Sequence, residues 1–230
     1  MPAPRPRQIS DILPKLQNVS TTSNFLVKFA LPSGGDGSGF FNGGLRGHLR
    51  RKGVNDRFIA DDAGLLCSDA VLPGSALATI NTVGDYQGLV ERMVHTRNFT
   101  QISLEFYVDK DYKMIKFFEH WMDYISSGSE KRRITSFSKA SPGYFYRMRY
   151  PKGDSGYKCD KTKIVKFNVD YNKEIEYTFI GMFPINLAST PVQYGNSDVL
   201  KVNCTFNYER YIAGESTNLS IKKGISENNS

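Results

Sequence analysis

The sequence predicts a mainly β domain of the α+β class with one flanking helix. Aromatic residues make up 13% of the chain, and Tyr and Phe favour the pleated surface of strands. Apolar and polar residues alternate over 101–108, as in a half-buried strand. From residue 114 the apolar period changes to that of a helix. These features indicate a sheet-rich core covered by a helix.

The length fits one domain with two terminal extensions. A chain of 230 residues can bury roughly 70–75% of its unfolded surface, so its core needs no cross-links. We predict a single domain over 24–212. Residues 1–23 form a proline-rich N-terminal arm, and the polar residues 213–230 form a loose C-terminal tail.

Alternating stretches indicate the strands. In the clearest one, at 101–108, Ile102, Leu104 and Phe106 share one face and polar residues share the other. The charge-mixed stretch 83–99 is expected to form a long hairpin. Further strands are predicted at 24–30, 65–72, 163–169, 174–180 and 199–208.

The two strands at 163–169 and 174–180 are expected to pair as a hairpin. The residues between them are Asp-Tyr-Asn-Lys, and Asn172 can adopt the positive φ that such turns need. The last strand carries apolar residues at every second position from Leu200 to Tyr208. One face of that strand should therefore lie in the core.

The helix is predicted over about 111–126. Asp109 and Asp111 suit its start, both as caps and electrostatically. Its apolar stripe consists of Met114, Phe117, Phe118, Trp121, Met122 and Ile125. Because this stripe must pack on a sheet, helix and strands together are expected to supply a core containing Phe106, Phe117, Trp121 and Phe206.

Two stretches between the predicted elements are expected to be long loop insertions. Residues 31–63 are rich in glycine and arginine, and glycine loses much entropy on folding while burying nothing. We interpret this stretch as a flexible projection or as a segment that only a partner orders. Residues 129–162 are basic and rich in tyrosine and glycine.

The sequence contains no spacing typical of nucleotide, metal or covalent chemistry. The phosphate-loop motif is absent, and the three Cys and three His show no metal-ligand spacing. Cys204 lies in the apolar row of a strand and is expected in the core, whereas His120 is expected to face water. We therefore expect no catalytic residue, no cofactor and no metal, and nothing argues for an enzyme.

The basic residues permit a second interpretation. The formal net charge is +7, and basic residues cluster beside aromatic ones at 46–52, 131–133, 147–152 and 161–166. Such mixtures occur on nucleic-acid-binding surfaces. However, no nucleic-acid-binding module signature accompanies them, which favours a solvated or partner-facing surface.

The sequence also predicts the compartment. No apolar run approaches the length of a membrane helix, and the first residues lack the apolar core of a secretory signal. The cysteines are odd in number and far apart, which does not suit a disulfide framework. We expect a soluble chain, without a membrane anchor, that folds in a reducing compartment.

Three stretches and their order resemble a known family. Asn24-Phe25-Leu26-Val27 opens the first strand after an arm, and residues 103–108 run directly into the aromatic helix. The most specific stretch is the turn 180–186, Ile-Gly-Met-Phe-Pro-Ile-Asn, which precedes a closing strand that ends in Tyr208-Glu209-Arg210-Tyr211. The chain thus resembles the tail tube proteins of contractile, myovirus-type phages.

The resemblance implies a β-sandwich or barrel-like core with one flanking helix. It also implies a non-enzymatic virion protein that assembles in the host cytoplasm as rings of six, stacked into a hollow tube. The implied partners are further copies, the contractile sheath, baseplate and terminator proteins, and phage DNA that passes without specific binding. Two alternatives remain open. One is a tube initiator near the baseplate or a tube-capping protein of the same family, and the other is a stand-alone nucleic-acid-binding β-domain.

Candidate subunit contacts follow from these expectations. In the 31–63 insertion, Phe40 and Phe41 can serve as anchors for a neighbour. The resemblance suggests that the polar hairpin region from Thr82 to Asn98 reaches the next ring. Its candidate contact residues are Asp85, Glu91, Arg92 and Arg97.

The channel is expected to be neutral to acidic. Lys and Arg that faced the channel would bind phosphates at many positions and hold the genome in place. The lumen candidates are the acidic residues of exposed strand faces and of the hairpin turn: Glu105, Asp170, Glu174 and Glu176. The excess Lys and Arg should then lie outside, toward a sheath or the subunit seams.

Overall fold

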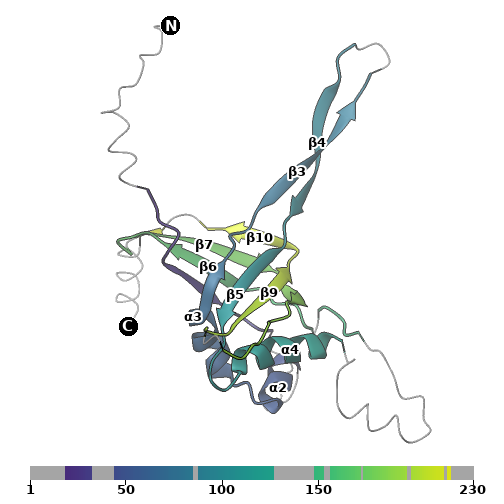
Figure 1. The fold of residues 1–230 in the computed structure, drawn as a ribbon. Helices are drawn as coiled ribbons and strands as arrows, with labels where there is room; N and C mark the ends of the chain where they lie inside the picture. Colours follow the sequence, from purple (N-terminus) through teal and green to yellow (C-terminus); the bar gives the residue numbers. More distant parts are fainter. Residues whose placement is uncertain are drawn as a thin grey trace, which may run out of the picture.

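Two antiparallel β-sheets enclose one hydrophobic core, and helices close one end of it (Figure 1). A separate two-stranded sheet projects from this body. The computed structural model describes residues 19–32, 44–84, 88–126, 148–152, 156–171, 173–195, 198–214 and 217–218. Within these residues, no helix is long and apolar enough to cross a membrane.

The first sheet has the strand order β1-β6-β7-β10, and β11 also pairs with β7. Its strands are β1 (Phe25–Lys28), β6 (Thr162–Phe167), β7 (Lys173–Ile180), β10 (Arg210–Ala213) and β11 (Thr217–Asn218). The predicted β6–β7 hairpin is confirmed, and Tyr171 has positive φ in its turn, whereas Asn172 lies outside the described residues. Because β10 and β11 pair with β7, the sheet continues into the stretch predicted as a loose tail.

The second sheet has the order β2-β5-β9-β8. Its strands are β2 (Cys67–Ala70), β5 (Ile102–Tyr107), β9 (Lys201–Asn207) and β8 (Phe183–Leu187). The predicted alternation on β5 and β9 is confirmed, since every second residue is buried. The segment expected to be a turn before the last strand is instead the edge strand β8. Pro184, which has no backbone N–H to donate, is tolerated in β8 because an edge strand pairs on one side only.

Helix α4 (Lys113–Ile125) covers the inner face of the second sheet, as its stripe predicted. Phe118 and Phe106 have ring centroids 5.2 Å apart, and Trp121 and Phe206 are 6.2 Å apart. Phe106, Phe117, Trp121 and Phe206 are all fully buried. At the helix start, the Met114 N–H donates to Oδ1 of Asp109 at 3.2 Å, so Asp109 acts as a cap.

The expectation that 31–63 contributes nothing to the core is wrong for residues 44–63. This part forms α2 (Gly44–Arg51), the π-helical turn η1 (Phe58–Asp62) and the start of α3 (Ala63–Leu65). Leu45, Leu49 and Val54 have no exposed surface. Two leucines four residues apart give a short helix an apolar face, even when its other residues are Gly, Arg and His.

The second insertion is also shorter than expected. Residues 156–160 belong to the domain, because Cys159 forms a β-bridge with Met182 and the Trp121 indole N–H donates to the Tyr157 carbonyl at 3.2 Å. The remainder of 129–162 that lies outside the described residues includes Lys131, Arg132, Arg133 and Arg147.

Candidate functional site

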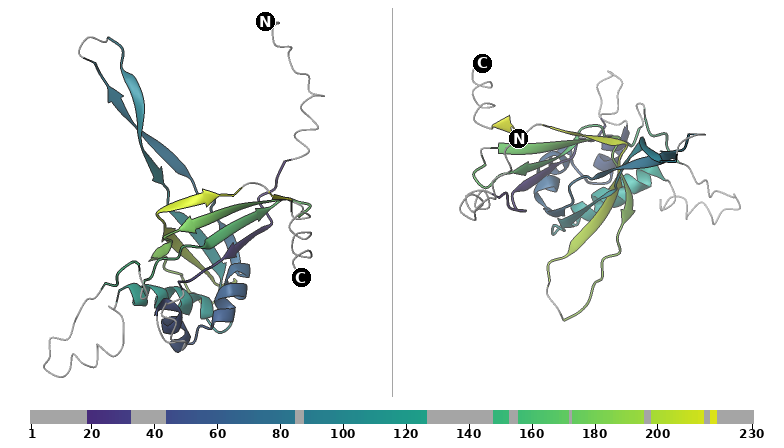
Figure 2. Two further views of the ribbon diagram at one scale, coloured as in Figure 1. Left: turned by 180° about the vertical axis from the view of Figure 1, so that it is seen from behind. Right: turned by 90° about the horizontal axis from the view of Figure 1, so that it is seen from above.

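The β3–β4 hairpin is the most exposed element of the described fold. It consists of β3 (Ser75–Thr82) and β4 (Glu91–Phe99), which form their own two-stranded sheet and extend away from the body (Figures 1 and 2). The hairpin expected at 83–99 is thus present, but its first strand begins earlier, at Ser75. A β-bulge at His95 shifts the register, since Ala78 pairs with Thr96 and Thr79 pairs with Val94.

The hairpin, which was expected to be polar, exposes apolar side chains on both of its faces. Ile80 pairs with Met93, and alternation places Ala76 and Ala78 on the same face. Ile80 is 54% exposed and Met93 is 48% exposed. On the opposite face, Leu77 is 60% exposed and Val94, which pairs with Thr79, is 61% exposed. A two-stranded hairpin is marginally stable in water, and a contiguous exposed apolar surface marks an interaction site. This hairpin therefore has the exposed apolar surface that is typical of an element that contacts another protein chain.

The root of the hairpin is fixed to the first sheet. The Arg97 guanidinium donates to the Ser75 hydroxyl at 3.0 Å, and it lies over the rings of Phe99 and Tyr211 at 5.2 and 5.7 Å. The Thr100 N–H donates to the Gly74 carbonyl at 3.2 Å. A fixed root holds the projecting strands in a defined direction.

The predicted contact residues differ in their surroundings. Glu91 and Arg92 are exposed on β4, as a contact role requires, whereas Arg97 binds within the root. Asp85, Phe40 and Phe41 lie outside the described residues.

The outer face of the second sheet is polar and nearly neutral. The Glu105 carboxylate accepts hydrogen bonds from the Lys201 ammonium at 2.9 Å and from the Ser68 hydroxyl at 3.1 Å. The hydrogen bond from Lys201 lowers the pKa of Glu105, and the same contact raises the pKa of Lys201. Beside this pair, the Ser103 hydroxyl donates to the Asn203 side-chain oxygen at 2.7 Å.

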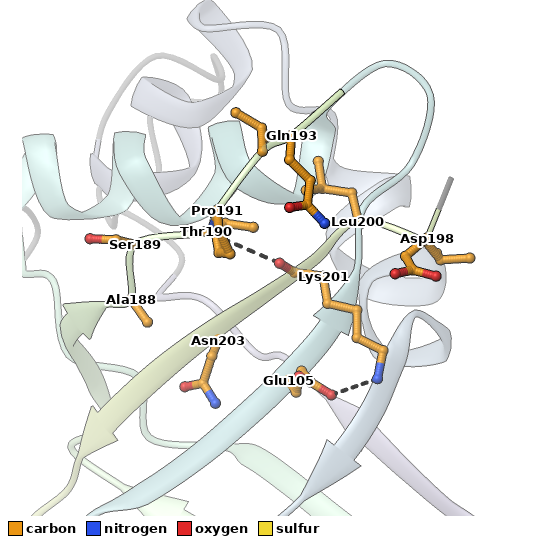
Figure 3. A pocket seen from close by; sticks show the side chains of 12 residues that line it. Glu105, Ala188, Ser189, Thr190, Pro191, Gln193, Asp198, Leu200, Lys201 and Asn203 are labelled. Carbon is orange, nitrogen blue, oxygen red and sulfur yellow. Dashed lines mark hydrogen bonds and ion pairs between the residues drawn. The ribbon is translucent and has the colours of Figure 1, made fainter. Parts of the chain in front are cut away.

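A groove of about 630 Å³ lies between this face and the described part of the β8–β9 loop, residues 188–195 and 198–200 (Figure 3). Glu105, Lys201 and Asn203 form its floor, and the loop forms its wall. The Thr190 hydroxyl donates to the Lys201 carbonyl at 3.2 Å and ties the loop to β9. Sequence reasoning missed this groove, because the loop contains no motif and only the strand pairing places it beside Glu105.

The lumen candidates do not share one surface. Glu105 lies on the outer face of the second sheet, whereas Glu176 lies on the outer face of the first sheet and pairs with Lys163 at 2.7 Å. Glu174 is only 8% exposed, although it was expected to be exposed on a strand face. Asp170 is exposed in the β6–β7 turn. Because the core lies between the sheets, their outer faces point away from each other.

The described residues carry no group suited to metal or thiol chemistry. No three His, Cys, Asp or Glu residues within them are placed to hold a metal ion. Burial raises the pKa of the Cys159 and Cys204 thiols, and it raises the pKa of Cys67 to about 12. The solvent-facing position expected for His120 is wrong, because α2 covers this part of α4 and places the His48 ring 6.4 Å away.

Comparison with known proteins identifies the family. A family model described as phage tail tube protein matches residues 20–214. The chain belongs to the phage tail tube protein family. This tail tube protein is therefore a structural subunit of a phage tail, as the sequence resemblance implied. A search of curated protein sequences gives no match.

Three solved structures are also similar to the tail tube protein. A chain of the anti-feeding prophage baseplate is 10% identical, with a TM-score of 0.46 over 85% of this chain and 95% of that one. A chain in the structure of the sheath/tube terminator of an extracellular contractile injection system is 13% identical, with a TM-score of 0.44 over 85% of this chain and 96% of that one. A chain in the structure of a sheath–tube complex of such a system is 15% identical, with a TM-score of 0.41 over 91% of this chain and 99% of that one.

Proposed function

We propose that this tail tube protein forms hexameric rings that stack inside a contractile sheath, and that the stacked rings conduct phage DNA. The observation that carries the stacking is the β3–β4 hairpin, which is fixed at its root and exposes the apolar side chains of Leu77, Ile80, Met93 and Val94. Head-to-tail contacts between identical subunits close into rings when the rotation closes and extend when it does not. A projecting hairpin suits the contact that extends from ring to ring.

The sheet edges suit the contacts within a ring. The first sheet ends at β1 and β10, and the second sheet ends at β2 and β8. Exposed strand edges attract further strands, so stable proteins cover or use them. In a ring, edge-to-edge pairing between neighbouring subunits would use these edges and produce a continuous wall.

The channel wall of the proposed tube is the outer face of the second sheet. On this face Ser103 and Asn203 present hydroxyl and amide groups, and Glu105 and Lys201 neutralise each other. The exposed Asp69, which pairs with Glu105 across the strands, makes the face slightly acidic. Such a face binds phosphates weakly, so DNA can pass. By contrast, the outer face of the first sheet includes Leu26 and Phe167, which suit a protein contact. The basic helix α2 would then face outward, toward the sheath.

Electron microscopy of the purified full-length protein tests this proposal. Wild-type protein at high concentration should form rings and tubes. The double variant Ile80→Asp/Met93→Asp should remain folded by circular dichroism, because both side chains are exposed, and should form no tubes. A matched control, Thr79→Asp/Asn81→Asp, adds the same two charges to the other face of β3 and should still form tubes.

The possible outcomes separate the candidate functions. Tubes formed by Ile80→Asp/Met93→Asp at wild-type length would contradict a stacking role for this face. One ring that never extends would instead indicate an initiator or capping protein. A monomer that binds DNA in a salt-sensitive way would indicate a nucleic-acid-binding domain.

A further inference from the structure

An apolar hairpin that stacks rings requires a receptor on the surface of another copy. In a head-to-tail assembly the receptor is a second patch of the same chain, because every subunit presents both halves of the contact. The following inference rests on the proposed stacking function. A receptor within the described residues would be a patch that is partly apolar and located at the opposite end of the subunit.

The β8–β9 loop has the required position. The hairpin ends at Phe99, directly before β5, and thus emerges at the end of the second sheet where Ile102 pairs with Phe206. The loop leads into Lys201, which pairs with Tyr107 at the other end of the same two strands. In Figure 1 the hairpin accordingly rises from one end of the body, and β9 begins at the end near α4. Stacking along this direction brings a hairpin toward a loop.

The loop also has the required chemistry. Val192 and Val199 line the groove and are 83% and 67% exposed, so they offer apolar surface beside a hollow. The groove carries Glu105, Asp198 and Lys201, which give one net negative charge. The hairpin residues 75–99 carry Asp85, Glu91, Arg92 and Arg97, whose formal charges sum to zero. Both surfaces are therefore partly apolar, and a hairpin without net charge can approach the acidic groove without like-charge repulsion.

Other exposed apolar residues fit less well. Val71 and Leu72 lie at the hairpin's own end of the sheet, because the Val71 N–H donates to the Ser103 carbonyl. Val169 and Tyr171 are exposed at the β6–β7 turn. A ridge such as a hairpin packs better into a hollow than onto a turn.

We propose that the β3–β4 hairpin of one subunit docks in the groove between the β8–β9 loop and the second sheet of a subunit in the next ring. The hairpin then covers Val192 and Val199 with the apolar side chains around Met93. Because this groove borders the proposed channel wall, the docked hairpin continues that wall from ring to ring.

Cross-linking between two single-cysteine additions tests the docking. Protein carrying Met93→Cys is mixed with protein carrying Val192→Cys, tubes are allowed to form, and a short bismaleimide is added. All of these positions are exposed in the single subunit, so the variants should fold as wild type. The competing receptor is tested by mixing Met93→Cys with Val169→Cys. Wild-type tubes measure the background from Cys67, a thiol of low reactivity.

We expect a covalent dimer with Met93→Cys and Val192→Cys that exceeds the Val169→Cys mixture and the wild-type background at least tenfold. It should appear only in samples that contain tubes. Tubes without this dimer, or with an equal dimer at Val169→Cys, would overturn the docking site and leave the tube function standing. Failure of every mixture and of the wild type to form tubes would overturn the proposed function and, with it, the docking.

Discussion

Gly64 marks the closest approach between a helix and a strand. A Cβ atom at this position would lie 1.7 Å from the Val27 carbonyl oxygen, which is backbone and cannot rotate away. Gly64→Ala should therefore push α3 off β1 and lower the free energy of unfolding by at least about 2 kcal/mol in urea denaturation. Gly88→Ala is the matched control, because nothing lies within 4 Å of its Cβ, and it should change stability by less than about 0.5 kcal/mol. Equal effects would contradict this packing.

His48 should make stability depend on pH. Burial, with Lys52, Arg51 and His120 nearby, lowers its pKa from 6.5 to about 4, and Asp123 opposes this shift. Between pH 6.5 and 4 the unfolded chain therefore binds a proton at this residue that the folded chain does not. The contribution of His48 to stability is complete above pH 6.5 and declines as the pH falls toward 4.

The His48 effect can be measured by urea unfolding at pH 7 and pH 5. We expect the wild type to lose about 1 kcal/mol through this residue, after allowance for its partial exposure. His48→Gln should show a correspondingly shallower pH dependence. His95→Gln, which changes an exposed histidine on β4, should keep the wild-type slope. A wild-type slope in His48→Gln would show that this imidazole does not titrate as described.

At the scale of elements, α2 departs most from the sequence prediction, because it belongs to the core and was expected to be part of a loop insertion. Leu49 is fully buried on α2, so Leu49→Ala should lower the free energy of unfolding by about 2–4 kcal/mol. Arg46→Ala, at an exposed position on the same helix, should stay within about 0.5 kcal/mol of wild type. Thermal or urea denaturation compares the two. A neutral Leu49→Ala would mean that α2 is not part of the core, as its glycine-rich neighbourhood suggested.

The sequence predicted the elements whose patterns are long and regular. The alternation on β5 and β9 and the helical stripe of α4 gave the second sheet and its covering helix. Helix α2 was missed because eight residues with two leucines give a weak periodic signal. The exposed apolar side chains of the hairpin were missed because strand β3 is exposed along its length and carries them on both faces, so no alternation marks them.

The candidate site was predictable only in part. Glu105 was assigned to an exposed strand face from alternation alone, and the structure places it there. Its partners Ser68 and Lys201 are 37 and 96 residues away in sequence. The pairing of β2, β5 and β9 brings these three residues together. The register of strands that are far apart in the chain could not be predicted from the single sequence. The same holds for the groove beside the β8–β9 loop.

At the scale of the whole molecule, the charge of the channel should control DNA passage. Glu105→Gln leaves Lys201 without its carboxylate partner on the proposed channel wall. Tubes should still form, because the docking contact of the hairpin with Val192 and Val199 is unchanged and exposed ion pairs contribute about 0–1 kcal/mol, but DNA ejection from virions should slow several-fold as Lys201 binds phosphates. Glu176→Gln breaks the matching pair with Lys163 on the other sheet and should leave the ejection rate unchanged. Slower ejection in Glu176→Gln alone would assign the channel to the first sheet.

A cryo-EM reconstruction of the assembled tube at side-chain resolution tests the central claim most directly. Our account predicts rings in which the β3–β4 hairpin of each subunit contacts the adjacent ring through Ile80 and Met93. It also predicts a channel lined by the outer face of the second sheet, with Glu105 and Asn203 at its surface. A tube whose hairpins point into solvent, or whose channel is lined by Arg132, Arg133 or Arg147, would contradict the account.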